Sequence, residues 1–487
     1  MCRPGRSPEA LQYKWVVASM TTVGGFMGSV DSSIVIIALP TLLHDLGATL
    51  VEGVWVVAGY TLAMTIFLVA LGKVGDMFGR VRLFNLGFTL FTIFSALCGL
   101  SQYGSELVVF RLVQGIGAAL LIVNSVALVA DAFPSSELGL GIGIYFMAWN
   151  VGAIAGYTLG GLIVGLLGWR FIFFVNVPIG IVGIVLSHRK LRETYRPVSW
   201  KFDYVGTILY STAMTLILVA LTLENVSTSI VFLLSIAGIL TLILFVLVER
   251  RIKEPALDLS LFRERAFSAG NVASFLNALA FNSLPFVVTL YLELVRHVDP
   301  LTTGLIFVPM EAAVMIIGPL SGKLSDTHSA RVLCSIGLFV NAVAIFWFSS
   351  LEQSTSFLPL ILALGFLGLG RGLFASPNAR SIMVPISDDK LGVANGIRTT
   401  VINSAAVVSV PLSLTFMSLA MPYNELSQIA QGVLLPSIQE TGMFLSALRY
   451  AIQMSAALVL LAVVPSLLRG ISRSEIDPVS PAQSVGE

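Results

Sequence analysis

Residues 72–82 read GKVGDMFGRVR and separate two apolar stretches, 53–72 and 83–101. Each stretch is close to the roughly 20 residues that an α-helix needs to cross a membrane. The segment between them combines glycines, an acid and basic residues. Glycines allow helices to approach closely, and Asp76 can lie at a helix N-terminus or pair with an arginine, so that the turn locks and releases. The segment therefore predicts a switchable turn between two membrane helices or, alternatively, an ordinary basic turn.

The same alternation of apolar stretches and short polar breaks extends over the whole chain of 487 residues. Hydrophobic residues make up 56% of it and charged residues 11%, whereas soluble proteins carry roughly 25% charged residues. Such a composition cannot fold around one aqueous core. We therefore expect an all-α membrane protein without a soluble domain. Because the net charge is close to zero, the chain is not expected to bind nucleic acid.

Polar breaks and Gly/Pro punctuation predict fourteen membrane-spanning helices. We place them near 15–40, 53–72, 83–101, 106–130, 138–167, 170–187, 204–223, 228–248, 267–292, 300–320, 331–350, 356–377, 391–419 and 443–468. Cytoplasmic loops are enriched in Lys and Arg, and 22 of the 28 such residues fall on the side that holds both termini. We therefore expect a multi-pass protein of the plasma membrane with both termini in the cytoplasm.

Two charge-rich segments, 188–203 and 249–266, divide the helices into six, two and six. A weak repeat relates the outer groups, because 72–76 reads GKVGD and 322–326 reads GKLSD, each after the second helix of its group. Carriers built from repeats bind substrate between the halves and rock one half against the other. We therefore expect a cytoplasmic N-terminus (1–14), a six-helix bundle (15–187), an inserted two-helix hairpin with its linkers (188–266), a second six-helix bundle (267–468) and a cytoplasmic tail (469–487).

Ionisable residues inside apolar helices are the first candidates for function, because each costs about 2.5–3.5 kcal/mol at the membrane centre. Asp31 precedes the helix end at Pro40 by nine residues, and Arg111 lies five residues inside its helix. At 1.5 Å per residue they lie roughly 13 and 7 Å below the outer helix ends. We predict that they contact each other, either to couple proton movement or as a purely structural ion pair.

Glu311 lies near the middle of its helix, too deep for its side chain to reach either surface. Burial disfavours the charged form of a carboxyl, so that Glu311 is suited to take up and release a proton. The alternative is a permanently neutral group that is hydrogen-bonded inside the bundle. Arg371 and Arg398 lie closer to helix ends, and we expect Arg371 to reach the membrane surface. If both faced a central cavity instead, they would favour an anionic substrate.

A substrate cavity is expected to combine apolar walls with a few polar groups. The candidate lining residues are Tyr60, Trp149, Asn150, Tyr157 and Arg398. A position facing lipid or the protein core is the alternative for each of them.

Sequence patterns of other protein classes are absent. The chain has no GxxxxGK[ST] segment for binding ATP phosphates, its histidines and cysteines show no metal or disulfide spacing, and no serine, histidine and acid grouping indicates hydrolysis. A membrane sensor would carry a soluble signalling domain, for which the sequence has no segment. We therefore expect a transporter rather than an enzyme, without cofactor or metal, that is driven by an ion gradient or works passively.

The segment at 72–82 resembles the signature between helices 2 and 3 of the major facilitator superfamily, at positions Gly72, Asp76, Gly79, Arg80 and Arg82. Further segments are similar to its fourteen-helix drug:proton antiporter branch: DSSIVIIALP (31–40), RLVQGIG (111–117), WRFIFFVNVP (169–178) and FDYVG (202–206). The resemblance implies two six-helix bundles with an inserted hairpin. It also implies proton-coupled export of small amphipathic compounds by alternating access, with Asp31 and Arg111 in proton coupling and an acid such as Glu311 in proton or substrate recognition.

The fifth helix carries glycines at the spacing of that family's antiporter motif, Gly143, Gly152, Gly156, Gly160 and Gly161. Small residues at such intervals let helices pack closely in lipid. Tyr157 stands where the motif has proline, so that a proton-coupled symporter or facilitator for an organic, and on one reading anionic, metabolite remains the alternative. We expect a monomer whose partners are a small-molecule substrate, protons and membrane lipid.

Overall fold

The computed structural model describes residues 8–134, 137–193, 203–223, 227–252, 257–387, 390–431 and 438–469. Within these ranges the side chains of 8–11, 69–76, 228, 392 and 438–439 are not described. Of the expected terminal segments, residues 1–7 and 470–487 lie outside the described residues, whereas 8–14 belong to the first helix, which begins earlier than predicted. Fourteen helices of the described chain are long and apolar enough to cross a membrane, which confirms the predicted number.

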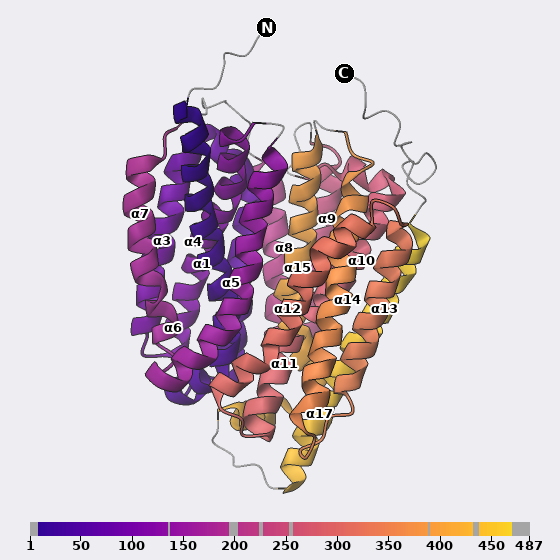
Figure 1. Cartoon of the computed structure of the whole chain (residues 1–487). Helices are drawn as coiled ribbons and strands as arrows, with labels where there is room; N and C mark the ends of the chain where they lie inside the picture. Colours follow the sequence, from indigo (N-terminus) through magenta and orange to yellow (C-terminus); the bar gives the residue numbers. More distant parts are fainter. Residues whose placement is uncertain are drawn as a thin grey trace.

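The N-terminal half consists of six spans, drawn from indigo to magenta in Figure 1. They are α1 (Pro8–Leu46), α2 (Leu50–Phe78), α3 (Arg80–Leu100), α4 (Gly104–Ala132), α5 (Leu138–Leu167) and the pair α6 (Phe171–Phe174) and α7 (Asn176–Lys190). Helix α1 packs along α5 and α4, while α4 also packs against α2 and α3. The sixth span was predicted as one helix, but Pro178 has no N–H to donate to the carbonyl of Phe174, so that the helical hydrogen bonds are interrupted there.

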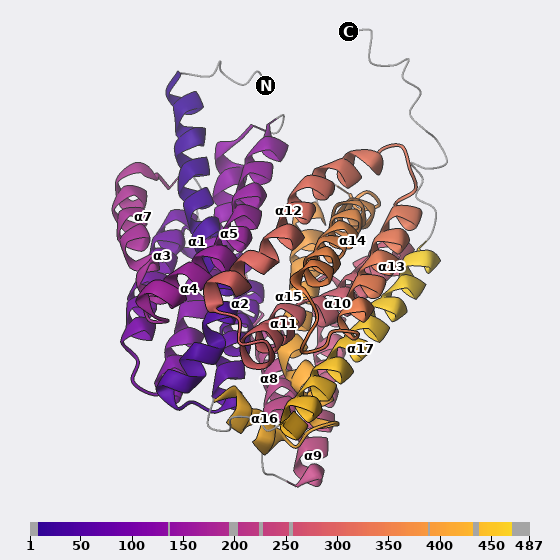
Figure 2. The same cartoon turned by 60° about the horizontal axis from the view of Figure 1, so that its bottom comes forward.

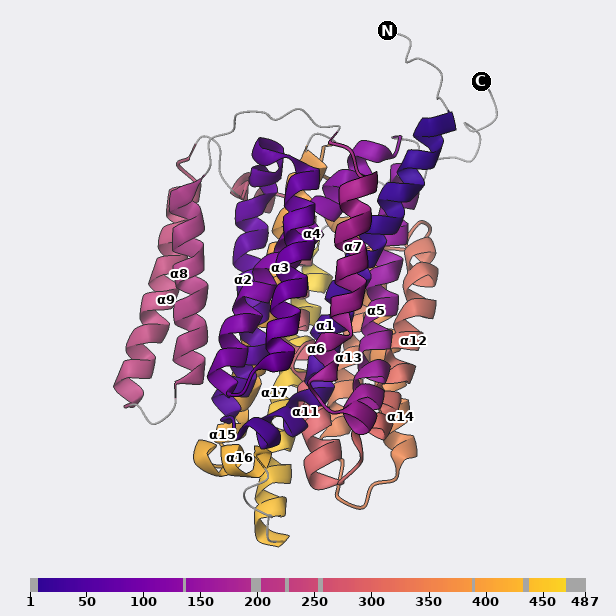
Figure 3. The same cartoon turned by 90° about the vertical axis from the view of Figure 1, so that its left-hand side faces the viewer.

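Helices α8 (Tyr204–Thr222) and α9 (Thr228–Glu249) form the inserted hairpin, which stands at one side of the molecule (Figure 3). Asp203 caps α8 by accepting a hydrogen bond from the N–H of Gly206 at 2.8 Å. Helix α8 contacts α2 and α15, while α9 packs mainly on α8. Phe232 and Leu233 of α9 are exposed, as expected for a surface that faces lipid.

The C-terminal half also contains six spans. Its elements are the 3-10 turn η1 (Leu259–Arg263), α10 (Arg265–Phe281), α11 (Leu284–Leu290), the π-helical turn η2 (Tyr291–Val295), α12 (Pro300–Leu324), α13 (Ala330–Phe348), α14 (Phe357–Met383), α15 (Leu391–Ser418), the short α16 (Tyr423–Ala430) and α17 (Ile438–Leu468). The span predicted as one helix at 267–292 is divided into α10, α11 and η2, because Pro285 cannot donate to the carbonyl of Phe281. Helix α16 was not predicted.

Helix α1 begins and α17 ends on the same side of the molecule, which we call the terminal face (top of Figure 1). The two halves meet on the opposite face, where α5 packs against α12. Gly161 of α5 lies so close to Pro300 and Leu301 that no Cβ would fit, and Gly304 lies equally close to the carbonyl of Tyr157. These glycines permit a backbone-to-backbone contact that holds the halves together.

The short helix α16 adds a further contact between the halves on the opposite face (Figure 2). The N–H of Leu50 donates to the hydroxyl of Ser427 at 3.3 Å, and Gln431 donates to the carbonyl of Ala48 at 3.0 Å. The described structure is therefore closed on the opposite face.

Candidate functional site

Asp31 of α1 and Arg111 of α4 form a fully buried ion pair, with 2.5 Å between Oδ2 and Nη1. The side chains are 0% and 1% exposed. The predicted contact between them is therefore confirmed, although its part in proton coupling stays a prediction.

A polar network surrounds this pair. The amides of Gln114 and Asn176 donate to Asp31 Oδ1 at 3.0 and 3.1 Å, and Arg111 donates to the carbonyl of Val56 at 3.1 Å. Both carboxylate oxygens of Asp31 thus have hydrogen-bond donors, as burial of a charged group requires. Sequence analysis did not single out Gln114 or Asn176. The signal for Gln114 was its spacing of three residues from Arg111, which places both on one helix face.

A second ion pair joins Glu311 of α12 to Arg371 of α14, with 3.3 Å between Oε1 and Nη1. Glu311 is buried, and the Arg371 guanidinium also lies 4.2 Å from the ring centroid of Phe281. The expectation that Arg371 reaches the membrane surface was wrong. Helix α14 continues to Met383, so that Arg371 lies about three turns from its end and pairs with Glu311 instead.

Tyr157 brings the N-terminal half next to this second pair. Its ring stacks on Phe307 with 5.1 Å between centroids, and Phe307 precedes Glu311 by four residues on α12. The contact that closes the opposite face is thus about one helical turn away from a buried carboxylate.

A cavity of about 440 Å³ lies between the halves, toward the terminal face. Helices α2 and α4 contribute Met64, Leu68, Ile122, Val123 and Val126; α5 contributes Tyr145, Phe146 and Trp149; α15 contributes Asn395, Gly396, Arg398, Thr399, Ile402 and Asn403. Its volume falls within the range of about 300–1,000 Å³ that is typical of small-molecule sites. Contributions from both halves make it the candidate substrate cavity.

Of the predicted cavity residues, Trp149 and Arg398 line this cavity and the other three do not. Tyr60 is buried beneath Arg111, whose guanidinium lies 4.0 Å from its ring centroid. Tyr157 is held in the contact between α5 and α12, and Asn150 is exposed outside the cavity. Their assignment to the cavity was wrong because helix phase, which the sequence shows only roughly, decides which side a residue faces.

The glycines of α5 have three different environments. Gly152, Gly156 and Gly160 lie against backbone atoms of α1, which confirms close packing there, whereas Gly161 lies against α12. Gly143 has open space at the position of a Cβ, so that its predicted packing role was wrong. Close contact between α1 and α5 links the helix that carries Asp31 to the helix that closes the opposite face.

The segment at 72–82 is mostly helical. Helix α2 continues to Phe78, and the chain turns at Gly79, whose φ of 102° lies in a region that favours glycine. Asp76 thus lies in the last turn of α2 and not at a helix N-terminus; the side-chain surroundings of Gly72 and Asp76 lie outside the described residues. The N-terminus of α3 is capped by Glu193, which accepts from the N–H groups of Arg80 and Val81 at 3.1 and 3.0 Å.

The basic residues of this segment differ in their contacts. Arg80 pairs with Asp131 of α4 at 2.6 Å, while Arg82 is exposed. The second half has an equivalent ion pair with the charges reversed. There the turn after α12 supplies the acid, Asp326, and α14 supplies the arginine, Arg380, with 3.1 Å between Oδ1 and Nη1. One ion pair thus joins each of these turns to a neighbouring helix on the terminal face.

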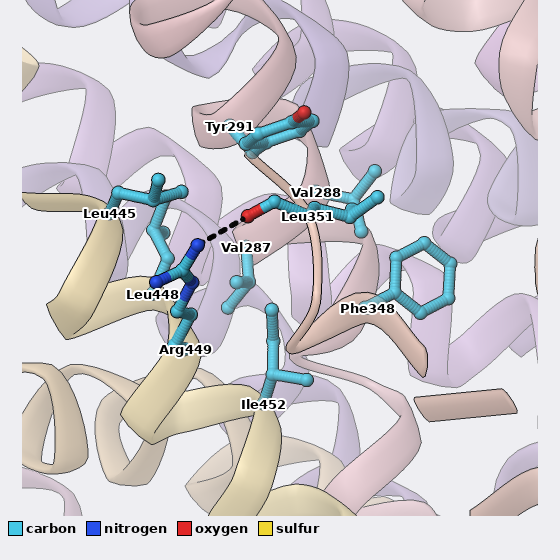
Figure 4. Close-up of a pocket in the computed structure, with 9 residues that line it drawn as sticks. All are labelled: Val287, Val288, Tyr291, Phe348, Leu351, Leu445, Leu448, Arg449 and Ile452. Atoms are coloured by element: carbon cyan, nitrogen blue, oxygen red, sulfur yellow. Dashed lines mark hydrogen bonds between the residues drawn. The ribbon is translucent and has the colours of Figure 1, made fainter. Parts of the chain in front are cut away.

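A second pocket, between α11, α13 and α17, is a small void of about 10 Å³ (Figure 4). This volume barely holds one water molecule. Arg449 at its edge donates to the carbonyl of Leu351 at 3.1 Å. No group of three or more His, Cys, Asp and Glu side chains within the described ranges could hold a metal ion.

Comparison with known proteins agrees with this arrangement. The family model "Major Facilitator Superfamily" matches residues 21–410. A bacterial homolog of the human lysosomal transporter Spinster, solved in an inward-facing and occupied conformation, superposes with a TM-score of 0.69 at 15% identity, covering 96% of this chain and 97% of that one.

Several relatives are about a third identical to the chain over the aligned residues. The riboflavin transporter RibZ of Clostridioides difficile is 31% identical over 416 residues, or 85% of this chain and 91% of the relative. The multidrug resistance protein Stp of Mycobacterium tuberculosis is 33% identical over 77% of this chain and 71% of the relative. The tetracenomycin C resistance and export protein of Streptomyces glaucescens is 32% identical over 74% and 67%. The chain therefore belongs to the major facilitator superfamily and is a multi-pass membrane transporter, not an enzyme.

Proposed function

We propose that the chain, as a monomer in the plasma membrane, exports small amphipathic organic compounds in exchange for protons. The observation that carries this proposal is the buried pair of Asp31 and Arg111, because Asp31 belongs to α1, which packs directly on α5. Protonation of Asp31 removes its charge and leaves Arg111 without a counter-charge. The pair can therefore convert proton binding into a change in how α1, α4 and α5 pack.

The described conformation fits one state of such a cycle. If the Lys and Arg distribution orients the chain as expected, the terminal face lies in the cytoplasm. The cavity then faces inward and the contact between α5 and α12 closes the outside. Substrate would enter from the cytoplasm in this state, and the outward-facing state would form when the contacts of Gly161 and Gly304 separate.

A proton would bind Asp31 from outside after the substrate has left, and would be released to the cytoplasm when the molecule faces inward again. The proton gradient supplies the energy, so that the cycle needs no cofactor. Glu311 and Arg371 form a second acid–arginine pair close to the moving contact. We assign this pair a role in linking the opening of the contact between α5 and α12 to binding of the proton or of the substrate.

Two of these relatives support export by their names, because they are described as a multidrug resistance protein and as a resistance and export protein. The third is named only as a riboflavin transporter. Together with Tyr157 in place of the motif proline, this keeps uptake by symport as a second candidate function. In proteoliposomes with an imposed pH step, an antiporter moves protons opposite to the substrate, whereas a symporter moves them with it.

The test of proton coupling is Asp31→Asn in such proteoliposomes. We expect uphill flux driven by the pH step to be lost, while exchange of substrate down its gradient continues, because the variant cannot carry a proton. Asp45→Asn is the matched control: Asp45 lies on the same helix but is exposed, and uphill flux should be unchanged. Wild-type uphill flux in Asp31→Asn would disprove the coupling role.

A further inference from the structure

The two walls of the central cavity differ in chemistry. Helix α5 presents the rings of Tyr145, Phe146 and Trp149, and α2 and α4 present aliphatic side chains. Helix α15 presents amides, a hydroxyl and the guanidinium of Arg398. A ligand that contacts both walls therefore has an apolar, ring-shaped part and a polar part.

Arg398 is the charged side chain among the described residues that line this cavity. It is half-buried, and its Nε is fully buried without a hydrogen-bond partner. Within the described part of the chain, no carboxylate pairs with it. A buried N–H that has lost water without gaining a partner is unfavourable, and a partly buried positive charge favours a counter-charge. A ligand that supplies an anionic acceptor to the guanidinium would therefore be stabilised here.

Three other arginines inside the spans have an acceptor for a terminal guanidinium nitrogen, although the Nε of Arg449 is unpartnered like that of Arg398. Arg111 pairs with Asp31, Arg371 pairs with Glu311, and Arg449 donates to the carbonyl of Leu351. Arg398 differs from them in that its side chain ends at a cavity large enough for a small molecule. The missing partner is thus located where a substrate would lie.

We infer that the substrates of this cavity are aromatic acids, whose anionic group pairs with Arg398 and whose ring packs on the aromatic residues of α5. Carboxylates suit arginine because two parallel hydrogen bonds form between the planar groups. Asn395, Thr399 and Asn403 add neutral donors and acceptors beside the guanidinium. The inference rests on the proposed transport of an organic substrate, because it concerns the same cavity.

The test is equilibrium binding to the purified full chain in detergent, where no gradient is present. Three probes share one ring system and differ in charge: naphthalene-2-carboxylate, naphthalene-2-methanol and naphthalene-2-methylammonium. We expect the carboxylate to bind about ten- to a hundredfold more tightly than the ammonium, since hydrogen bonds to charged groups contribute that much to affinity. Octanoate, an acid without a ring, should bind more weakly than the naphthalene carboxylate.

Two variants of the arginine locate the effect. Arg398→Gln should lose carboxylate binding by a similar factor and keep binding of the neutral probe, while Arg398→Lys should keep part of the preference for the acid. Arg331→Gln is the control, because it removes an exposed positive charge near the terminal face, and the affinities should not change. The preference of the wild type among the probes tests the inference even if Arg398→Gln does not fold.

Three results would overturn the inference: tighter binding of the ammonium probe by the wild type, unchanged carboxylate binding in a folded Arg398→Gln, or no binding of any naphthalene probe at millimolar concentration. Failure of proton coupling is a separate result. In that case the acid preference in detergent persists while the pH step drives no flux. Conversely, uphill flux of neutral or cationic compounds without acid preference would leave proton-coupled export standing and refute the aromatic-acid inference.

Discussion

Buried charges of this chain have different partners, and the partner indicates the task. Arg111 and Arg371 each face an acid, Arg449 faces a carbonyl, and Arg398 faces a cavity. An acid beside an arginine inside the membrane can either carry a proton or release it and form an ion pair with the arginine. An arginine without an acid can bind an anion that comes and goes.

At Glu311, replacement by glutamine tests whether the second pair takes part in proton coupling. Glutamine keeps the size and can still accept from Arg371, but it cannot carry a proton. We expect Glu311→Gln to be expressed and folded, and to lose transport driven by a pH step in proteoliposomes. Unchanged flux would remove Glu311 from the mechanism and leave a structural pair with Arg371.

Asp258, in the linker before α10, lies outside the membrane-spanning segments. Its pKa is lowered because the Ser260 hydroxyl donates to it at 2.5 Å and Lys390 lies 3.0 Å away. A lowered folded-state pKa stabilises the fold above the unfolded-state pKa, and this contribution is lost as the pH falls through the folded-state value.

We therefore expect Asp258→Asn to lower stability at neutral pH by at most about 1 kcal/mol, as for other partly exposed pairs. Thermal unfolding in detergent at several pH values measures the difference from the wild type. The difference should begin to shrink below roughly pH 4, the ordinary pKa of an Asp, and disappear once the pH has fallen through the lowered folded-state pKa. A difference that stays constant down to strongly acidic pH would contradict this account.

At the scale of elements, α5 connects the proton site to the contact between the halves. One part of it packs on α1, which carries Asp31, and its end packs on α12. The glycines decide both contacts, since they let the helix backbones approach more closely than any side chain would allow.

Replacing glycines of α5 by alanine distinguishes the effect of close packing on stability from the effect of helix propensity. At Gly156 a Cβ would lie 2.7 Å from the Ser33 hydroxyl and 2.8 Å from the carbonyl of Val30, so that Gly156→Ala should destabilise the protein by about 1–3 kcal/mol through overpacking. At Gly143 a Cβ meets nothing, and Gly143→Ala should be neutral or stabilise by up to about 1 kcal/mol. Unfolding in detergent compares the two, and equal effects would show that the contact with α1 is not tight.

At the scale of the whole molecule, the halves touch through glycines on the opposite face and leave a cavity toward the terminal face. A contact that depends on the absence of a Cβ can be opened by adding one. Gly161→Ala should therefore shift the population toward a conformation that is open on the opposite face.

Spin labels at exposed Gln102 and Gln353, on opposite-face loops of the two halves, would measure this shift by pulsed EPR after Cys2 is replaced by serine. Cys98 and Cys334 are buried and should not react. The label distance should increase in Gly161→Ala and stay unchanged in the control Gly165→Ala, since Gly165 has space for a Cβ. An unchanged distance in Gly161→Ala would mean that the contact does not hold the halves.

Local chemistry alone predicted much of this protein. Apolar stretches of membrane length gave the fourteen spans, since a backbone in lipid must form helices. The depths of Asp31 and Arg111 along their helices predicted their contact, because a buried arginine needs a nearby acid. Tertiary structure alone decided which side each helix turns to its neighbours and where each helix ends. It therefore paired Arg371 with Glu311. It also kept Tyr60 and Tyr157 out of the cavity and placed Arg398 inside it. The physical reason is that the packing of whole helices, and not the sequence of any one segment, decides which residues of two helices face each other.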